Sequence, residues 1–212
     1  MTKAQPRREF LRRAGAAALA GAAGAFGRAH VVRAAWNVPA PPSGNGHDRL
    51  QPDWYKKKIA QVQQEMAKPK LDAFVLLNAT NVIYTTGYFH LSTERPLAVL
   101  IPKSGEPALF IPELETDQVK LWWIKDYESY FDYPGPRNRI RWIFERVAKR
   151  GFAHGRIGIE DATTERLRHI KAGAPGARIV VAGELIERMR YVKDDDELAM
   201  MRRAMEFADF TV

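Results

Sequence analysis

The stretch LDAFVLLNATNVIYTTGY, residues 71–88, combines a predicted strand with a short helix or turn. Within it, residues 72–77 are a short apolar run of strand length, which predicts a buried strand. Residues 78–86 predict a short helix or turn, which Gly87 closes. The stretch therefore begins an alternation of strand and helix, the pattern from which α/β domains are made.

The same alternation continues on both sides of this stretch. A helical pattern at 53–68 ends before Pro69. Further strands are predicted at 95–102, 107–112, 127–133, 156–160 and 178–182, and further helices at 113–123, 138–150, 163–171 and 184–191. The polar loop 103–106, which contains Gly105, predicts a hairpin between two of the strands. The sequence thus predicts an α/β fold, a mixed β-sheet flanked by helices on both faces.

A well-marked amphipathic helix is predicted at the end of the sequence. Asp194 is a favourable N-cap, and Glu197 completes a capping box three residues later. Apolar residues recur on one face at steps of three and four, at Leu198, Met201, Met205, Ala208 and Val212. No glycine, proline or basic last turn stops this helix. We therefore expect it to lead into a further domain.

The net charge of +8 is concentrated in residues 1–35. Seven basic residues face one acidic residue there, which leaves 26 basic against 24 acidic residues in the rest of the chain. A charge balance this even provides no electrostatic footprint for a phosphate backbone, which excludes a nucleic-acid partner. The absence of cysteine excludes a disulfide framework, a thiolate metal site and a cysteine nucleophile.

Residues 1–35 resemble a twin-arginine export signal. The pair Arg7-Arg8 precedes Phe10-Leu11, and an Ala/Gly-rich segment too short to span a bilayer follows at 14–26. We expect this signal to be cleaved and to send the protein to the periplasm or the outside of the cell. A disordered basic tail or an uncleaved anchor is the alternative.

The remaining chain divides into three parts. Residues 36–51 are rich in Pro, Gly and Ser and are predicted to be a linker. The α/β domain is expected at 52–190, and the start of the helix that leads into the further domain at 191–212.

No motif in the sequence makes a self-sufficient active site. The first predicted strand ends in residues 78–81, NATN, without the glycine turn of a dinucleotide site. His154 and His169 are isolated and are interpreted as surface residues. His90 lies in a loop with Glu94 and Arg95, where function often resides, although a partly exposed loop histidine is the alternative. Acidic residues at 113–117 and 194–197 are interpreted as helix caps.

Three pieces of the sequence fit one known pattern. The stretch 71–88 fits it at Asp72, Asn81, Tyr84, Gly87 and Tyr88. The hairpin fits at Arg95 and Gly105, and the last helix at Arg190, Val192, Lys193, Glu197, Met201, Arg202 and Ala204. Together they resemble the N-terminal domain of the creatinase/prolidase family over residues 72–209. The resemblance implies a creatinase N-terminal domain-like fold that ends in a handover helix, the helix that leads into a catalytic domain.

The family includes Xaa-Pro dipeptidases, aminopeptidase P and creatinase. The resemblance implies that its peptidases bind two divalent metal ions, such as manganese, cobalt or zinc, through two Asp, one His and two Glu. These metals would polarise the scissile carbonyl and supply a bridging hydroxide. All of these ligands lie beyond the handover helix, so we expect no catalytic residue and no metal ligand in this chain.

The resemblance also implies that the domain supports dimerisation and that its loop 88–95 reaches the active site of the partner. Arg95 would pair with a substrate carboxylate, because a guanidinium binds a carboxylate bidentately. Tyr88 and His90 would shape the rim of the pocket. Pairing of Arg95 with a nearby acid is the alternative.

Two functions remain open from the sequence. In the first, the chain is the non-catalytic N-terminal part of an exported Xaa-Pro peptidase-like metallohydrolase. It would act as a homodimer or with a separate catalytic chain, on peptides with proline at the second position. In the second, it is a free-standing, non-catalytic binding or dimerisation module. A creatinase-type hydrolase that does not cleave peptides remains possible within the first.

Overall fold

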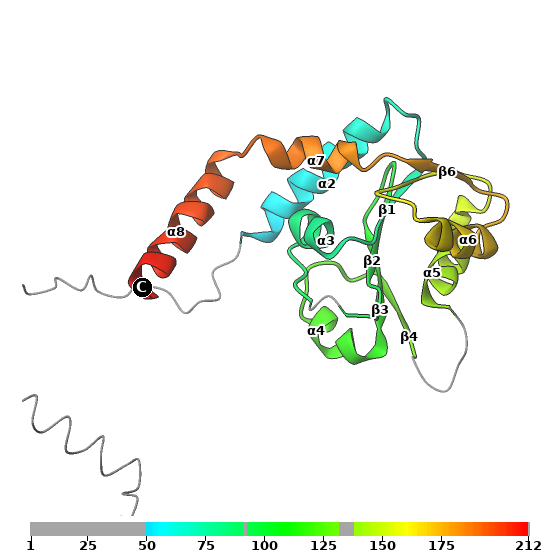
Figure 1. Cartoon of the computed structure of the whole chain (residues 1–212), viewed down its shortest axis with the longest axis horizontal. Helices are drawn as coiled ribbons and strands as arrows, with labels where there is room; N and C mark the ends of the chain where they lie inside the picture. The colour runs from blue at the N-terminus through cyan, green and yellow to red at the C-terminus, as the bar shows by residue number, and fades with distance from the viewer. Residues whose placement is uncertain (1–49, 91–92, 132–137, 212) are drawn as a thin grey trace, which may run out of the picture.

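A computed structural model describes residues 50–90, 93–131 and 138–211 and shows one sheet between two layers of helices (Figure 1). The export signal predicted at 1–35 and nearly all of the predicted linker lie outside the described residues.

The sheet has six strands in the order β4-β3-β2-β1-β5-β6. Their bounds are β1 Ala73–Leu76, β2 Ala98–Pro102, β3 Ala108–Pro112, β4 Tyr127–Tyr130, β5 Arg156–Ile159 and β6 Arg178–Val181. The pairs β1–β2 and β2–β3 are antiparallel, while β1–β5, β3–β4 and β5–β6 are parallel. The predicted hairpin is the β2–β3 pair, in which Val99 lies opposite Leu109.

Helices cover both faces of this mixed sheet, as the sequence predicted. They are α2 Pro52–Met66, α3 Ala79–Thr86, α4 Thr116–Lys120, α5 Arg139–Val147, α6 Thr164–Gly173, α7 Glu184–Tyr191 and α8 Asp195–Thr211. Because successive strand residues face opposite sides, Phe74 packs under α2, α3, α4 and α7, whereas Val75 packs under α5 and α6.

Some predicted boundaries were wrong, for local reasons. The strand predicted from residue 95 begins at Ala98, after Pro96, which has no N–H for a ladder hydrogen bond. The helix predicted at 113–123 is a 3₁₀ turn, Glu113–Glu115, followed by the short α4. The helix predicted at 138–150 ends at Val147, and the π-helical turn that follows contains Gly151 at a φ of +97°.

Asp72 joins three strands of the sheet. Its carboxylate accepts hydrogen bonds from the Arg156 backbone N (2.9 Å) and from Lys103 Nζ (3.0 Å). Arg156 is the first residue of β5, and Lys103 directly follows β2. These two strands lie on either side of β1. The backbone of Arg156 and the ammonium of Lys103 hold the pKa of Asp72 below its ordinary value.

Glu160, just after β5, fixes the start of α3. Its carboxylate accepts hydrogen bonds from the backbone N of Leu77 (2.6 Å) and Asn78 (2.7 Å) and from Asn81 Nδ2 (2.6 Å). Arg190 of α7 completes this network by donating to Asn81 Oδ1 at 3.0 Å. Burial raises the pKa of Glu160, although the hydrogen bonds from Leu77 and Asn81 oppose that shift. Asn81 and Arg190, both matched by the family pattern, therefore meet across 109 residues of sequence.

Gly87 ends α3 and packs closely against α2. Its φ of +67° is left-handed, and its N donates to the Ile83 O at 2.7 Å. A Cβ at this position would lie 2.4 Å from the Tyr55 ring. Only glycine both adopts this left-handed conformation without strain and leaves room for the Tyr55 ring.

The predicted capping box opens α8. The Glu197 backbone N donates to Asp194 Oδ1 at 2.8 Å, and the Asp194 N donates to Glu197 Oε2 at 3.1 Å. Helix α2 holds this box through Trp54 Nε1, 2.9 Å from Asp194 Oδ2, and through Lys58 Nζ, 3.0 Å from Asp194 Oδ2 and 3.1 Å from Glu197 Oε2.

Beyond the capping box, α8 projects away from the sheet (Figure 1). The stripe residues Leu198, Met201 and Met205 are exposed by 36%, 50% and 64%. Among the described residues, no helix is both long enough and apolar enough to cross a bilayer.

Candidate functional site

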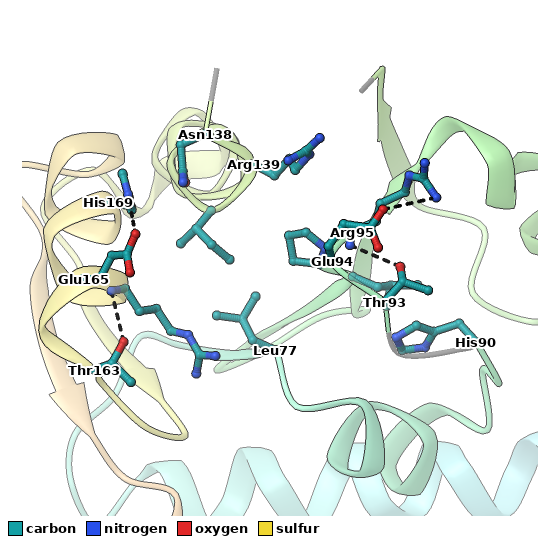
Figure 2. Close-up of a pocket in the computed structure, with 14 residues that line it drawn as sticks. Leu77, His90, Thr93, Glu94, Arg95, Asn138, Arg139, Thr163, Glu165 and His169 are labelled. Atoms are coloured by element: carbon teal, nitrogen blue, oxygen red, sulfur yellow. Dashed lines mark hydrogen bonds and ion pairs between the residues drawn. The ribbon is translucent and has the colours of Figure 1, made fainter. Parts of the chain in front are cut away.

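A cavity of about 410 Å³ lies at the sheet edge where β1 ends (Figure 2). Leu77 and segment 93–97, which leads into β2, contribute to one wall. The first residues of α5 and α6 form the opposite side. Its size lies within the range of small-molecule sites, about 300–1,000 Å³.

The topology of the sheet explains why a cavity forms here. The neighbouring strands β1 and β5 are parallel, so both end at this edge. The chain leaves β1 into α3, whose Val82 packs on one face of the sheet. It leaves β5 into α6, whose Ile170 packs on the other face. Where connections diverge in this way, a crevice opens outside the carboxyl ends of the strands, and ligands of α/β proteins bind in such crevices.

Of the three residues predicted to contact substrate, the structure brings His90 and Arg95 to this cavity and places Tyr88 beside it. Tyr88 is completely buried, and its hydroxyl donates to the Glu115 carbonyl at 3.3 Å. Its ring stacks on His90, with 6.5 Å between the ring centroids. Burial, reinforced by the Glu115 carboxylate, raises the pKa of Tyr88, so the hydroxyl stays protonated at neutral pH. Tyr88 can therefore act on the cavity through the position of His90.

His90 presents an unused polar atom. Its Nδ1 is buried and has no hydrogen-bond partner among the residues that the structure describes. Burial lowers the pKa of His90 below its ordinary value of 6.5, against the attraction of Glu115 and a hydrogen bond with the Tyr88 backbone. The imidazole is therefore neutral at pH 7 and can hydrogen-bond a ligand in the cavity.

Arg95 pairs with a nearby acid, the alternative that the sequence left open. Its Nη1 lies 3.6 Å from Glu94 Oε1, and its backbone N donates to Thr93 Oγ1 at 3.1 Å (Figure 2). The Glu94 side chain is 71% exposed, whereas that of Arg95 is 30% exposed. A pair so open to water is weak, so a ligand anion can replace Glu94.

Sequence reasoning missed the other side of the cavity. His169, interpreted as a surface residue, lines the cavity, has 24% of its side chain exposed and contacts Glu165 at 4.0 Å. Arg139 and Arg166 also line the cavity, at the starts of α5 and α6. The N-caps Asn138 and Thr163 were the only signals in the sequence, and they locate helix starts without showing that two helices begin side by side.

The charged side chains at the cavity differ in exposure, and the arginines are the less exposed. Three arginines, Arg95, Arg139 and Arg166, line the cavity with Glu94 and Glu165, and Arg166 also pairs with Asp161. The glutamate side chains are 71% and 78% exposed, while those of Arg95 and Arg166 are 30% and 34% exposed. Water therefore screens the carboxylates more than the guanidiniums.

The described residues do not fit a metal centre. Across 50–90, 93–131 and 138–211, no three His, Asp or Glu side chains gather at metal-binding distance. The acids at 113–117 instead make local contacts: Ser129 Oγ donates to Glu113, and Asp117 pairs with Lys120 at 2.8 Å.

Comparisons with known proteins agree with the fold. Residues 58–192 match the model of the Creatinase/Prolidase N-terminal domain. An uncharacterized peptidase of Staphylococcus epidermidis is 28% identical over 153 residues, which cover 72% of this chain and 41% of the relative.

Two solved structures show how much of a relative the chain represents. The dipeptidase PepE from Mycobacterium ulcerans superposes with a TM-score of 0.58 at 22% identity, covering 72% of this chain and 40% of that one. The N-terminal domain of a Xaa-Pro dipeptidase from Lactobacillus brevis gives 0.54 at 25% identity, covering 62% of this chain and 99% of that one. The chain thus spans about two fifths of the length of its longer relatives.

Proposed function

Because the chain belongs to the Creatinase/Prolidase N-terminal domain family, we propose that it is the non-catalytic N-terminal part of a Xaa-Pro peptidase-like metallohydrolase. The names of relatives support a peptidase in preference to a creatinase-type enzyme, since they include a Xaa-Pro dipeptidase and a putative dipeptidase of Bacillus subtilis. The substrate would be a peptide with proline at its second position.

The observation that carries this proposal is the exposed stripe of α8. Burial of the exposed parts of Leu198, Met201 and Met205 would contribute about 3 kcal/mol, since a fully buried side chain of this size contributes about 1.5–3 kcal/mol. The pairing of Lys58 with Asp194 and Glu197 fixes where α8 starts. We propose that α8 is the handover helix and that its stripe packs on the catalytic domain.

The metal ions of the reaction belong to that catalytic domain in this proposal. The described residues of this chain do not fit a dinuclear metal site, so we derive no catalytic step from them. Their part is to bind and position. In a homodimer, or with a separate catalytic chain, Arg95 would exchange Glu94 for a substrate carboxylate, and His90 would offer its unused Nδ1.

The location of the protein is a separate proposal. The pair Arg7-Arg8 and the apolar segment 14–26 support export by the twin-arginine pathway to the periplasm or beyond. Replacing both arginines with lysine should leave the protein in the cytoplasmic fraction, measured by fractionation and immunoblotting. Unchanged export would contradict the proposal.

A paired substitution in α8 tests the handover role. Met201→Lys with Met205→Lys should abolish association with the catalytic domain, because two charges would enter an apolar contact. The matched control is Ala199→Lys, an exposed position of the same helix that lies off the stripe.

The measurement is co-purification on the full chain from its own cells, followed by sequencing of the retained polypeptide. We expect a polypeptide with the Asp, Asp, His, Glu, Glu ligand set, retained by the wild type and the control and lost by the double variant. Equal retention by all three proteins would contradict the role of the stripe.

A further inference from the structure

Strand β6 leaves one edge of the sheet open. It is the last strand in the order β4-β3-β2-β1-β5-β6, so β5 pairs with one of its sides and no strand of the described residues pairs with the other. Three of its four residues are apolar and β-branched, and the last of them, Val181, is 60% exposed. An open edge strand of this composition is a template for pairing with another strand.

The opposite edge strand, β4, is protected from such pairing. Its Glu128 carries a charge and is held by two arginines, Arg146 at 3.3 Å and Arg150 at 2.9 Å. Charged side chains on an edge strand discourage its pairing with another chain, and β6 has none between its first residue and its end. The difference between the two edges indicates that β6 is the one available for a partner.

The backbone of β6 shows which of its polar groups face outward. The N–H groups of Arg178 and Ala182 donate to carbonyl oxygens on the β5 side, both at 2.9 Å. Since the backbone groups of successive strand residues point to opposite sides, those of Ile179 and Val181 point away from β5. Only the backbone of another extended strand offers donors and acceptors at the same spacing.

These outward groups are self-complementary about a two-fold axis at Val180. In an antiparallel pair, Ile179 of one copy would lie opposite Val181 of the other, and the two residues would exchange both of their backbone hydrogen bonds. The symmetry repeats this exchange on the other side of the axis. Val180 would lie opposite its own copy, so that β-branched residues contact each other across the strands on both faces of the sheet.

Charge complementarity favours a second copy as the partner. Arg178 and Glu184 are exposed, and neither side chain has an ion-pair partner among the described residues. In the two-fold pair, Arg178 would lie opposite Ala182 of the other copy, two residues before Glu184 of that copy. Arg178 shares a sheet face with Val180, which packs on the cluster that contains α7, the helix that begins at Glu184. Two symmetric pairs of Arg178 with Glu184 would therefore flank the joined strands.

We infer that two copies of this chain join their sheets through β6, by antiparallel pairing about Val180. The inference goes beyond the proposed function because it gives a homodimer a definite surface, which requires neither a catalytic domain nor α8.

Single cysteine substitutions locate the axis, since the chain has no cysteine of its own. Val180→Cys should form a disulfide with its own copy on mild oxidation, because Cα atoms of such a pair lie about 4.5 Å apart, within the range that a disulfide spans. The matched control is Val181→Cys, at the more exposed position, which should stay unlinked because it would lie diagonally from its own copy, about 7–8 Å away. Non-reducing gel electrophoresis of the full chain is the measurement. Equal linking of the two variants, or none of Val180→Cys, would overturn the inference.

The dissociation constant of the dimer tests the backbone pairing. Sedimentation equilibrium on the full chain with Met201→Lys and Met205→Lys measures it without any contribution from the stripe of α8, so failure of the handover proposal leaves this test intact. Val181→Pro should weaken the dimer at least about tenfold, since it removes an outward N–H and no hydrogen bond to β5. Val181→Ala keeps the N–H and should weaken the dimer less. Equal effects of the two substitutions, or a protein that stays monomeric up to millimolar concentration, would contradict the pairing.

A charge exchange tests the partner. Arg178→Glu should weaken the dimer about tenfold, because two attractive contacts become repulsive, and adding Glu184→Arg to the same chain should restore it. Circular dichroism shows whether each variant folds, and the charge variants decide if Val181→Pro does not. Failure of the double variant to regain affinity would overturn the assignment of a second copy to this edge.

Discussion

Lys58 is the buried charge on which the position of α8 depends. It is 5% exposed on α2, and its ammonium contacts Asp194 and Glu197 at 3.0 and 3.1 Å. It also lies 4.5 Å from the centroid of the Trp54 ring. Lys58→Met keeps much of the side-chain volume and removes the charge, so it leaves two carboxylates without their cation.

The expected cost follows from the burial of each partner. Breaking a fully buried pair costs about 3–5 kcal/mol. Glu197 is nearly buried, with 9% of its side chain exposed, but 42% of the Asp194 side chain is exposed and water replaces much of its lost interaction. We therefore expect a loss of about 2 kcal/mol in the free energy of unfolding, or about 6 °C in Tm.

The pH dependence of this loss has a definite sign. Although burial opposes it, hydrogen bonds to Asp194 raise the pKa of Lys58 above its ordinary value of 10.5. A raised pKa stabilises the fold at every pH below 10.5 and ceases to do so as the pH rises through the pKa of the folded state. The difference between wild type and Lys58→Met should therefore stay constant from neutral pH to about 10 and shrink above 10.5.

Urea unfolding, followed by circular dichroism, is the assay. The matched control is Lys56→Met on the same helix, where the pair with Asp53 is exposed by 57% and 84%. The control should change the free energy of unfolding by less than about 0.5 kcal/mol. Equal losses in the two variants, or a difference that does not begin to shrink as the pH rises above 10.5, would contradict this prediction.

Two further predictions concern residues of the family pattern. Gly87→Ala should cost about 3 kcal/mol, because a left-handed φ is strained for alanine and its Cβ would overlap the Tyr55 ring. Gly105→Ala, at a φ of +97° with open space around it, should cost only about 1 kcal/mol in the same urea assay, and equal costs would show that the contact with Tyr55 is unimportant. Asp72 has a lowered pKa, so its stabilising effect should be present above pH 3.8 and disappear as the pH falls below that value. Asp72→Asn should therefore lose less stability than wild type on acidification below pH 4, and parallel acid-unfolding curves would contradict this.

Local patterns were sufficient to predict most of the fold. Strands such as β1 are continuous apolar runs, and α8 carries its capping box within four residues of sequence. Both depend on neighbours along the chain, which sequence reasoning can evaluate. The order of the strands depends on pairing between distant segments, and no local pattern specifies it.

The family pattern identified residues before their roles were visible. Asn81 and Arg190 were matched as separate positions, yet they act together by hydrogen-bonding each other beside Glu160. Glu160 itself follows a short strand and carries no motif, so nothing in the sequence indicated that it receives two backbone N–H groups.

The cavity shows more clearly which features of the site could not be predicted from the sequence. The loop with His90 and Arg95 could be predicted because it directly follows the stretch 71–88, which matches the family pattern. Arg139, Arg166 and His169 could not, because they reach the cavity only when α5 and α6 begin side by side at the end of β1. That arrangement follows from the parallel pairing of β1 with β5, between segments more than 80 residues apart.

We propose that this chain is the positioning part of a Xaa-Pro peptidase whose chemistry resides in a catalytic domain. Manganese-dependent hydrolysis of Ala-Pro tests it most directly, measured for residues 1–212 purified alone and for the assembly isolated on that chain from its own cells. We expect hydrolysis by the assembly, lost on addition of a chelator, and none by the purified chain. Hydrolysis by the chain alone, or an assembly that leaves Ala-Pro intact, would contradict it.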